Sequence, residues 1–147
     1  MSEYIYRVDS IKNLEQVCND SFRASRWTKE MYPHQVLKDI KSRQNEEDGL
    51  YFICFFTTQP LAENSLKNDF FYLDEEAKIS RCCKEKVLRA GFTESWDDGF
   101  DQGKAYLFWC EEPLSKNNNK FSEKNISTNQ FETLSEGKWI PLSQLFQ

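Results

Sequence analysis

The sequence lacks any apolar run long enough to cross a bilayer, and its first residues carry neither a basic region nor an apolar stretch of signal-peptide length. These absences predict a soluble chain with no membrane span and no cleaved leader. Internal repeats are also missing. The pattern is typical of a globular protein.

Metal-binding patterns are absent as well. Histidine occurs once, and the five cysteines form neither a Cys-x-x-Cys pair nor a His-Cys spacing typical of a metal site. We expect reduced thiols that fill space in a cytosolic setting. A redox role for the neighbours Cys82 and Cys83 is the alternative. Packing is favoured, because consecutive residues on a helix point about 100° apart.

An excess of positive charge is lacking too, since 19 basic residues stand against 24 acidic ones and the net charge is −5. This balance disfavours nucleic acids and anionic membranes as partners. Aromatic residues are plentiful, with 12 Phe, 6 Tyr and 4 Trp to supply a core. A chain of 147 residues fits one domain, residues 1–147, that buries roughly 70% of its unfolded surface.

Hydrophobic patterning predicts a mixture of strands and helices in the first half of the chain. A strand is expected from Tyr4, followed by a short helix for which Ser10 is the N-cap. Pro33 fits the first turn of a second helix. Residues 50–58 form a near-continuous apolar run, which is typical of a strand buried on both faces.

In the second half, a third helix is expected with Asp74 as its cap, Ile79 to Ala90 on its length and Gly91 as its stop. Residues 105–110 predict another core strand, and two more strands are expected after residue 129. The fold class is therefore α+β.

The two ends of the chain hold the candidate functional residues. Alternation in the first strand puts Arg7 on the face opposite Tyr4, Tyr6 and Val8, and a cation in such a strand usually has a partner. Alternation near the C-terminus predicts that Gln130 and Glu132 project together while Phe131 points into the core.

These two segments resemble the mono-ADP-ribosyltransferase toxins, in the branch of the pertussis and cholera toxin catalytic subunits. The resemblance rests on Tyr6-Arg7-Val8-Asp9-Ser10 near the start, and on Gln130-Phe131-Glu132 followed by Ile140-Pro141 near the end. It implies two small, mostly antiparallel sheets around an NAD cleft with flanking helices. It also implies transfer of ADP-ribose from NAD to a protein acceptor.

The resemblance assigns roles to nine residues and offers two candidates for a further contact. Glu132, Gln130 and His34 would be catalytic, and the NAD-binding set would be Arg7, Asp9, Ser10, Trp27, Thr57 and Thr58; Phe121 or Phe131 would contact the acceptor. Glu132 would stabilise the positive charge that develops on the ribose, as carboxylates do in glycosidases. The Arg7 fork suits phosphate and ribose oxygens. His34, in the first turn of its helix, would be kept neutral by the helix dipole.

Further expectations concern the acceptor. Residues 111–129 are rich in Lys, Asn and Ser; they read either as a solvated loop or, by the resemblance, as an acceptor-recognition loop, and we favour recognition. Gln at position 130 goes with non-arginine acceptors in the family. The resemblance also implies a bacterial effector that modifies a host protein in the host cytosol.

One segment departs from the family pattern. The toxins carry Ser-Thr-Ser where this chain has Phe56-Thr57-Thr58, and Thr57 is the residue expected to hold Glu132. The departure supports one alternative, an impaired relative that binds a partner or NAD without turnover. Two further alternatives are an unrelated interaction domain and a merely structural ion pair between Arg7 and Glu132.

Overall fold

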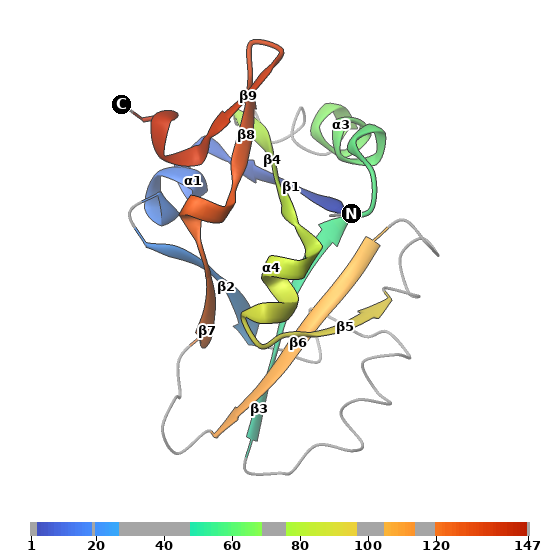
Figure 1. Cartoon of the computed structure of the whole chain (residues 1–147), viewed down its shortest axis with the longest axis vertical. Coiled ribbons are helices and arrows are strands. Elements are labelled where there is room, and N and C mark those ends of the chain that lie inside the picture. Colours follow the sequence, from blue (N-terminus) through green and yellow to red (C-terminus); the bar gives the residue numbers. More distant parts are fainter. Residues whose placement is uncertain are drawn as a thin grey trace. The chain divides into compact units, whose positions relative to one another are not determined.

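The computed structural model describes residues 3–18, 20–26, 48–68, 76–96, 105–113 and 120–146, whose elements are labelled in Figure 1. The chain divides into two compact units that are each assembled from separate stretches. Unit 1 takes in Met1–Phe22, Phe56–Lys86 and Ile126–Gln147, and unit 2 takes in Arg23–Phe55 and Val87–Asn125. The assignment of one domain stays a prediction.

Unit 1 is built on four antiparallel strands, which pair in the order β1 (Tyr4–Ser10), β4 (Ala77–Cys83), β8 (Glu132–Ser135) and β9 (Lys138–Pro141). Its helices are α1 (Ile11–Val17), α3 (Gln59–Asn68) and the short 3₁₀ helices η2 (Thr128–Gln130) and η3 (Leu142–Gln144). The division between the units falls inside β2 (Ser21–Arg26), β3 (Asp48–Phe56), α4 (Lys84–Arg89) and β7 (Phe121–Ser127).

The register of unit 1 defines two rows of side chains that run across its strands. One row consists of Arg7, Ser80, Thr133 and Ile140. The next row consists of Tyr6, Arg81, Glu132 and Pro141. Because consecutive residues of a strand point to opposite faces, the two rows lie on opposite faces of the sheet. We call these the Ser80 face and the Arg81 face.

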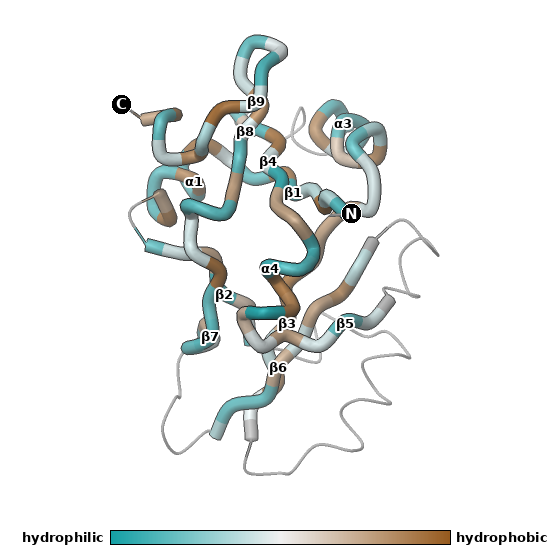
Figure 2. Tube along the Cα trace, in the orientation of Figure 1, coloured by the Kyte–Doolittle hydropathy of each residue, from teal (hydrophilic) through white to brown (hydrophobic). Residues whose placement is uncertain are grey.

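A tight hairpin joins β8 to β9. Glu136 and Gly137 both have positive φ, 52° and 79°, and the flanking pair is Ser135 with Lys138. Two such residues form a type I′ turn, whose twist matches that of paired strands, and the glycine meets this requirement without steric cost. The tip of the hairpin is hydrophilic (Figure 2). The turn length sets which residues of β9 face which residues of β8.

Helix α1 begins where β1 ends because Ser10 caps it. The Ser10 side chain accepts a hydrogen bond from the Asn13 backbone N–H at 3.1 Å, as the sequence predicted. The helix buries Leu14 completely. On the Ser80 face, the rings of Phe22 and Phe131 pack with centroids 4.2 Å apart, so this face contributes to the core of unit 1.

Unit 2 is organised around β3, which pairs with β2 on one side and with β6 (Ala105–Pro113) on the other. Strand β5 (Thr93–Trp96) pairs with β6, and β7 pairs with β2. Alternate side chains of β3 and β6 form two groups: Leu50 and Phe52 with Leu107, and Phe55 edge-to-face on Phe108 at 5.6 Å. Both strands therefore contribute to packing on two faces, as their apolar runs predicted.

The predicted α+β class is confirmed, since the described residues are mostly antiparallel strands together with three α-helices. The strand expected over residues 50–58 is β3 and ends at Phe56, and residues 105–110 lie within β6. The structure also contains β2 and α3, which were not predicted from the sequence. The helix expected near Pro33 lies outside the described residues.

Two expectations about elements are wrong. Residues 77–83 form β4 rather than the first half of a helix, and only Lys84–Arg89 are helical. Pairing with β1 and β8 on both sides outweighs the weak helical periodicity of this segment. The segment 111–129 is not one long loop either, because β6 runs to Pro113 and β7 covers Phe121–Ser127.

Candidate functional site

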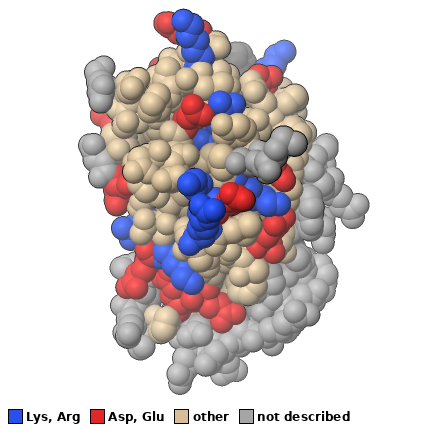
Figure 3. Space-filling model, viewed as in Figure 1, with Lys and Arg blue, Asp and Glu red and all other residues tan. Residues whose placement is uncertain are grey.

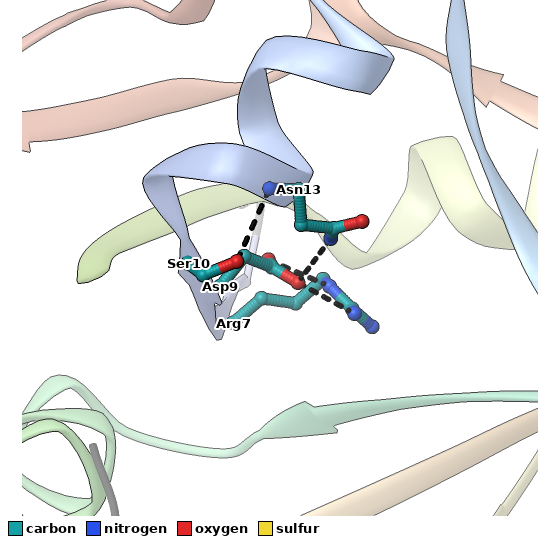
Figure 4. A network of polar contacts seen from close by, with 4 residues as sticks. All are labelled: Arg7, Asp9, Ser10 and Asn13. Carbon is teal, nitrogen blue, oxygen red and sulfur yellow. Dashed lines mark hydrogen bonds and ion pairs between the residues drawn. The ribbon is translucent and has the colours of Figure 1, made fainter. Parts of the chain in front are cut away.

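Arg7 takes part in a polar network at the junction of β1 and α1 (Figure 4). Its Nε and Nη2 groups donate to the two oxygens of the Asp9 carboxylate at 3.2 and 3.0 Å. Asn13 donates a further hydrogen bond to Asp9 at 3.0 Å. The Asp9 side chain is 5% exposed and that of Arg7 is 21% exposed. The two predicted NAD-binding residues Arg7 and Asp9 are thus bonded to each other.

The residues around this network hold β1 against α1. The guanidinium carbon of Arg7 lies 5.6 Å from the centre of the Phe22 ring, and Ser10 caps α1. An ion pair of this kind, bidentate and bonded to a third group, fixes the end of the strand against the helix that follows. The network explains why a cation lies on the buried face of β1.

Glu132 lies in a different cluster, on the Arg81 face. Its Oε1 accepts a hydrogen bond from the Nε group of Arg81 at 3.0 Å. The guanidinium carbon of Arg81 lies 4.1 Å from the ring centres of both Tyr4 and Trp139. The rings of Tyr6 and Trp139 are 6.1 Å apart. We call these five residues the Arg81 cluster.

The cluster is partly open to solvent. Tyr4 is 38% exposed and the Glu132 side chain is 39% exposed, whereas the Arg81 side chain is only 19% exposed. A guanidinium that contacts two aromatic rings loses little freedom when it binds a further group, because its plane is already fixed. The arrangement offers a rigid cation within an aromatic surface.

Arg7 and Glu132 do not converge. Arg7 is in register with Ser80, Ser80 is in register with Thr133, and Glu132 precedes Thr133 on β8. Arg7 therefore lies on the Ser80 face and Glu132 on the Arg81 face. The expectation that the two side chains meet at one dinucleotide is wrong for this arrangement. So is the alternative of a direct Arg7–Glu132 ion pair, since each has its own partner.

Gln130 and Phe131 do not fit the roles that the resemblance gave them. Gln130 belongs to η2 rather than to a strand, so it does not alternate with Glu132, and its amide bonds to Asn129 at 2.9 Å. Phe131 is 1% exposed, which confirms its core position and contradicts a role as an acceptor contact. Phe121, the other candidate contact, is 52% exposed.

The threonines that follow β3 have local roles. Within the described part of the chain, the Glu132 carboxylate bonds to Arg81 and not to Thr57. The Thr58 hydroxyl accepts a hydrogen bond from the Leu61 N–H at 3.4 Å at the start of α3. Trp27 and His34 lie outside the described residues, so their predicted roles stay predictions.

A second polar cluster, which the sequence analysis missed, lies in unit 2. The Glu112 side chain accepts from the backbone N–H of Glu123 at 2.7 and 3.0 Å and from that of Lys124 at 3.0 Å, and Glu112 is 6% exposed. The Cys110 thiol also contacts this carboxylate, at 3.8 Å. Glu112 thus joins β6 to β7 through backbone donors, which makes it a structural carboxylate.

Burial shifts the pKa of two thiols. Loss of solvation raises the pKa of Cys82 to about 12, with a further increase from Cys83 and a decrease from Arg7. Loss of solvation also raises the pKa of Cys110 to about 12, and the charge of Glu112 adds to it. Both thiols stay protonated at neutral pH, so they pack as small apolar groups.

The described residues also bear on membrane spans and metal sites. None of the described helices is long and apolar enough to span a membrane. The same part of the chain contains no group of three His, Cys, Asp or Glu side chains placed to hold a metal ion. The described residues therefore offer no candidate metal site made of such side chains.

Comparisons with known proteins return no match to a family model, to a curated protein or to a solved structure. The resemblance to the toxins therefore rests only on the residues named above. Within the described structure, the Arg81 cluster is the best-defined group of partly exposed residues that the sequence analysis did not assemble.

Proposed function

We propose that this chain is a binding module that recognises a partner protein through the Arg81 cluster, without turnover of NAD. The observation that supports this proposal is the contact of Arg81 with both Tyr4 and Trp139 on a partly exposed sheet face. Tyr, Trp and Arg are the residues most enriched where protein interfaces derive their binding energy.

Charge also favours a protein partner over a polyanion. The chain carries a net charge of −5, and Lys and Arg side chains lie next to Asp and Glu side chains in several places on the visible face (Figure 3). A nucleic acid or an anionic membrane is attracted by an extended basic surface. A mixed surface around aromatic anchors is typical of protein interfaces instead.

The transferase predicted from the resemblance requires Arg7 and Glu132 on one face, and their separation counts against it. Transfer of ADP-ribose, NAD binding, an ADP-ribosyltransferase-like fold and a host-cytosol location stay predictions. These predictions belong to the transferase hypothesis, in which His34 and Trp27 would contribute to an NAD site.

Affinity capture tests the proposed function. The whole chain is immobilised in four versions, the wild type, Tyr4→Ala, Trp139→Ala and the control Phe121→Ala, which removes a more exposed aromatic ring from unit 2. A partner identified by capture is then purified and titrated against each version. We expect Trp139→Ala to weaken its binding by a factor of about 30, a loss typical of a central interface residue, and Phe121→Ala to leave it unchanged.

Equal binding by the wild type and Trp139→Ala would overturn the proposed surface. In parallel, each version is incubated with labelled NAD and lysate. Glu132→Gln is added to this incubation, and labelled protein that appears with the wild type and disappears with Glu132→Gln would support the transferase instead.

A further inference from the structure

We infer that the Arg81–Glu132 pair is a binding site for a primary carboxamide, the side-chain group of Asn or Gln on the partner protein. The inference rests on the proposed function, because it names the chemical group that this surface receives.

The pair presents both donors and an acceptor. A guanidinium has five N–H donors, and among the described residues the Arg81 side chain makes one hydrogen bond, through its Nε group. The terminal Nη groups remain to donate. Glu132 uses Oε1 for the ion pair, and its Oε2 has no protein partner within the described structure. A ligand that meets both side chains must therefore accept a hydrogen bond and donate one.

The charge of the pair selects an uncharged ligand. Arg81 and Glu132 sum to zero, so an anion at the Nη groups would also meet the Glu132 carboxylate and a cation at Oε2 would also meet the Arg81 guanidinium. Either like-charge contact lowers the affinity. A carboxylate moreover has no proton to donate, and an ammonium has no acceptor.

The geometry of amides narrows the choice further. A trans peptide group has its C=O and N–H on opposite edges, so one backbone amide cannot meet Arg81 and Glu132 together. A primary carboxamide has one N–H on the same side as its C=O, and it presents the two groups as a single edge. Asn and Gln are the protein side chains with this edge.

The aromatic rings make the site rigid and partly dry. Tyr4 and Trp139 hold the guanidinium plane, with both ring centres 4.1 Å from its carbon, and the Arg81 side chain is 19% exposed. A fixed donor loses little entropy on binding, and low solvent exposure strengthens its hydrogen bonds. The flat ring surfaces also suit the planar amide.

The test is a titration of the ¹⁵N-labelled whole chain with four small probes: propionamide, propionate, N-methylacetamide and propylammonium. We expect propionamide to shift the Trp139 indole N–H and the Arg81 Nε–H signals in a saturable way, and the other three probes to act more weakly. Loss of one hydrogen bond corresponds to about a fivefold lower affinity, so Arg81→Lys and Glu132→Gln should each weaken propionamide by about that factor. Glu15→Gln, an exposed change on α1, is the matched control and should have no effect.

Several outcomes overturn the inference: no response to propionamide, tighter binding of propionate, an equal response to N-methylacetamide, or full affinity in Glu132→Gln. The comparison of probes on the wild type does not depend on the folding of any variant. Capture of a partner that depends on Trp139, without a propionamide response, overturns this inference and leaves the proposed function standing. A propionamide response without capture of any partner supports the carboxamide site and overturns the proposed function.

Discussion

The hydroxyl groups of Ser80 and Thr133 lie 3.0 Å apart between β4 and β8, and both residues are fully buried. This hydrogen bond fixes the register of the two strands from inside the core. Arg7 is directly across from Ser80 on β1. The register of β1 with β4 places Arg7 on the Ser80 face, and the register of β4 with β8 places Glu132 on the Arg81 face, which separates the two residues that the transferase hypothesis joins.

Replacement of Thr133 by Val should lower the free energy of unfolding by about 1–2 kcal/mol, because the Ser80 hydroxyl would be left buried without its partner. Urea denaturation measures the change. The double variant Ser80→Ala/Thr133→Val should be less destabilised than the sum of the two single variants, since it leaves no orphaned hydroxyl. Additive effects would show that the hydroxyls do not interact.

Asp9 is expected to stabilise unit 1 through its bonds to Arg7 and Asn13. Asp9→Asn keeps the volume but removes the charge, and it should lower the free energy of unfolding by about 2 kcal/mol. The exposed change Glu15→Gln serves as the control in the same denaturation experiment. An Asp9→Asn protein as stable as this control would contradict the structural role of the network.

High pH should destabilise the protein through its buried thiols. Cys82 has a folded pKa of about 12 against a reference value of 9.0, so above pH 9 the unfolded chain loses this proton while the folded chain keeps it. The unfolded state then binds fewer protons, and stability falls by up to about 1.4 kcal/mol per pH unit towards pH 12. The stability contributed by the neutral thiol is fully present below pH 9.

Denaturation of the wild type and of Cys82→Ala at a series of pH values measures this contribution. The variant should lose less stability between pH 8 and pH 10, since one of the two buried thiols is gone. Identical pH profiles would mean that Cys82 ionises equally in both states.

Glu112 is expected to join β6 and β7 in unit 2. Glu112→Gln replaces a charged acceptor of two backbone N–H groups, so it should cost about 2–3 kcal/mol of stability. Hydrogen exchange of the Glu123 and Lys124 amides should become faster in this variant. The neighbouring change Glu111→Gln is the control, and unchanged exchange in Glu112→Gln would refute the assignment.

The sequence predicted the elements whose signals are local. Ser10 capped its helix as expected, and the apolar runs at residues 50–58 and 105–110 became β3 and β6. These elements carry their own cap or hydrophobic pattern. The class of the fold followed from them.

The site could not be predicted in the same way. Arg81 lies in a segment where spacing suggested a helix, and its position on β4 depends on pairing with β1 and β8, which are distant in sequence. A strand face is decided by register, and register is a long-range property. The 3₁₀ helix at Thr128–Gln130 interrupts the strand alternation that would have placed Gln130 beside Glu132. We found no residue in that segment that predicts this interruption from the sequence.

The two-residue turn between β8 and β9 controls the composition of the Arg81 cluster. With the turn length kept, one residue inserted after Gly137 would move Trp139 to the other side of its strand and bring Lys138 into its place, while Arg81 and Glu132 kept their pairing. A change in the turn can therefore move the Trp139 indole away from the Arg81–Glu132 ion pair while the pair itself stays in place. Such an insertion would show how much of the recognition each part supplies without removing a single side chain.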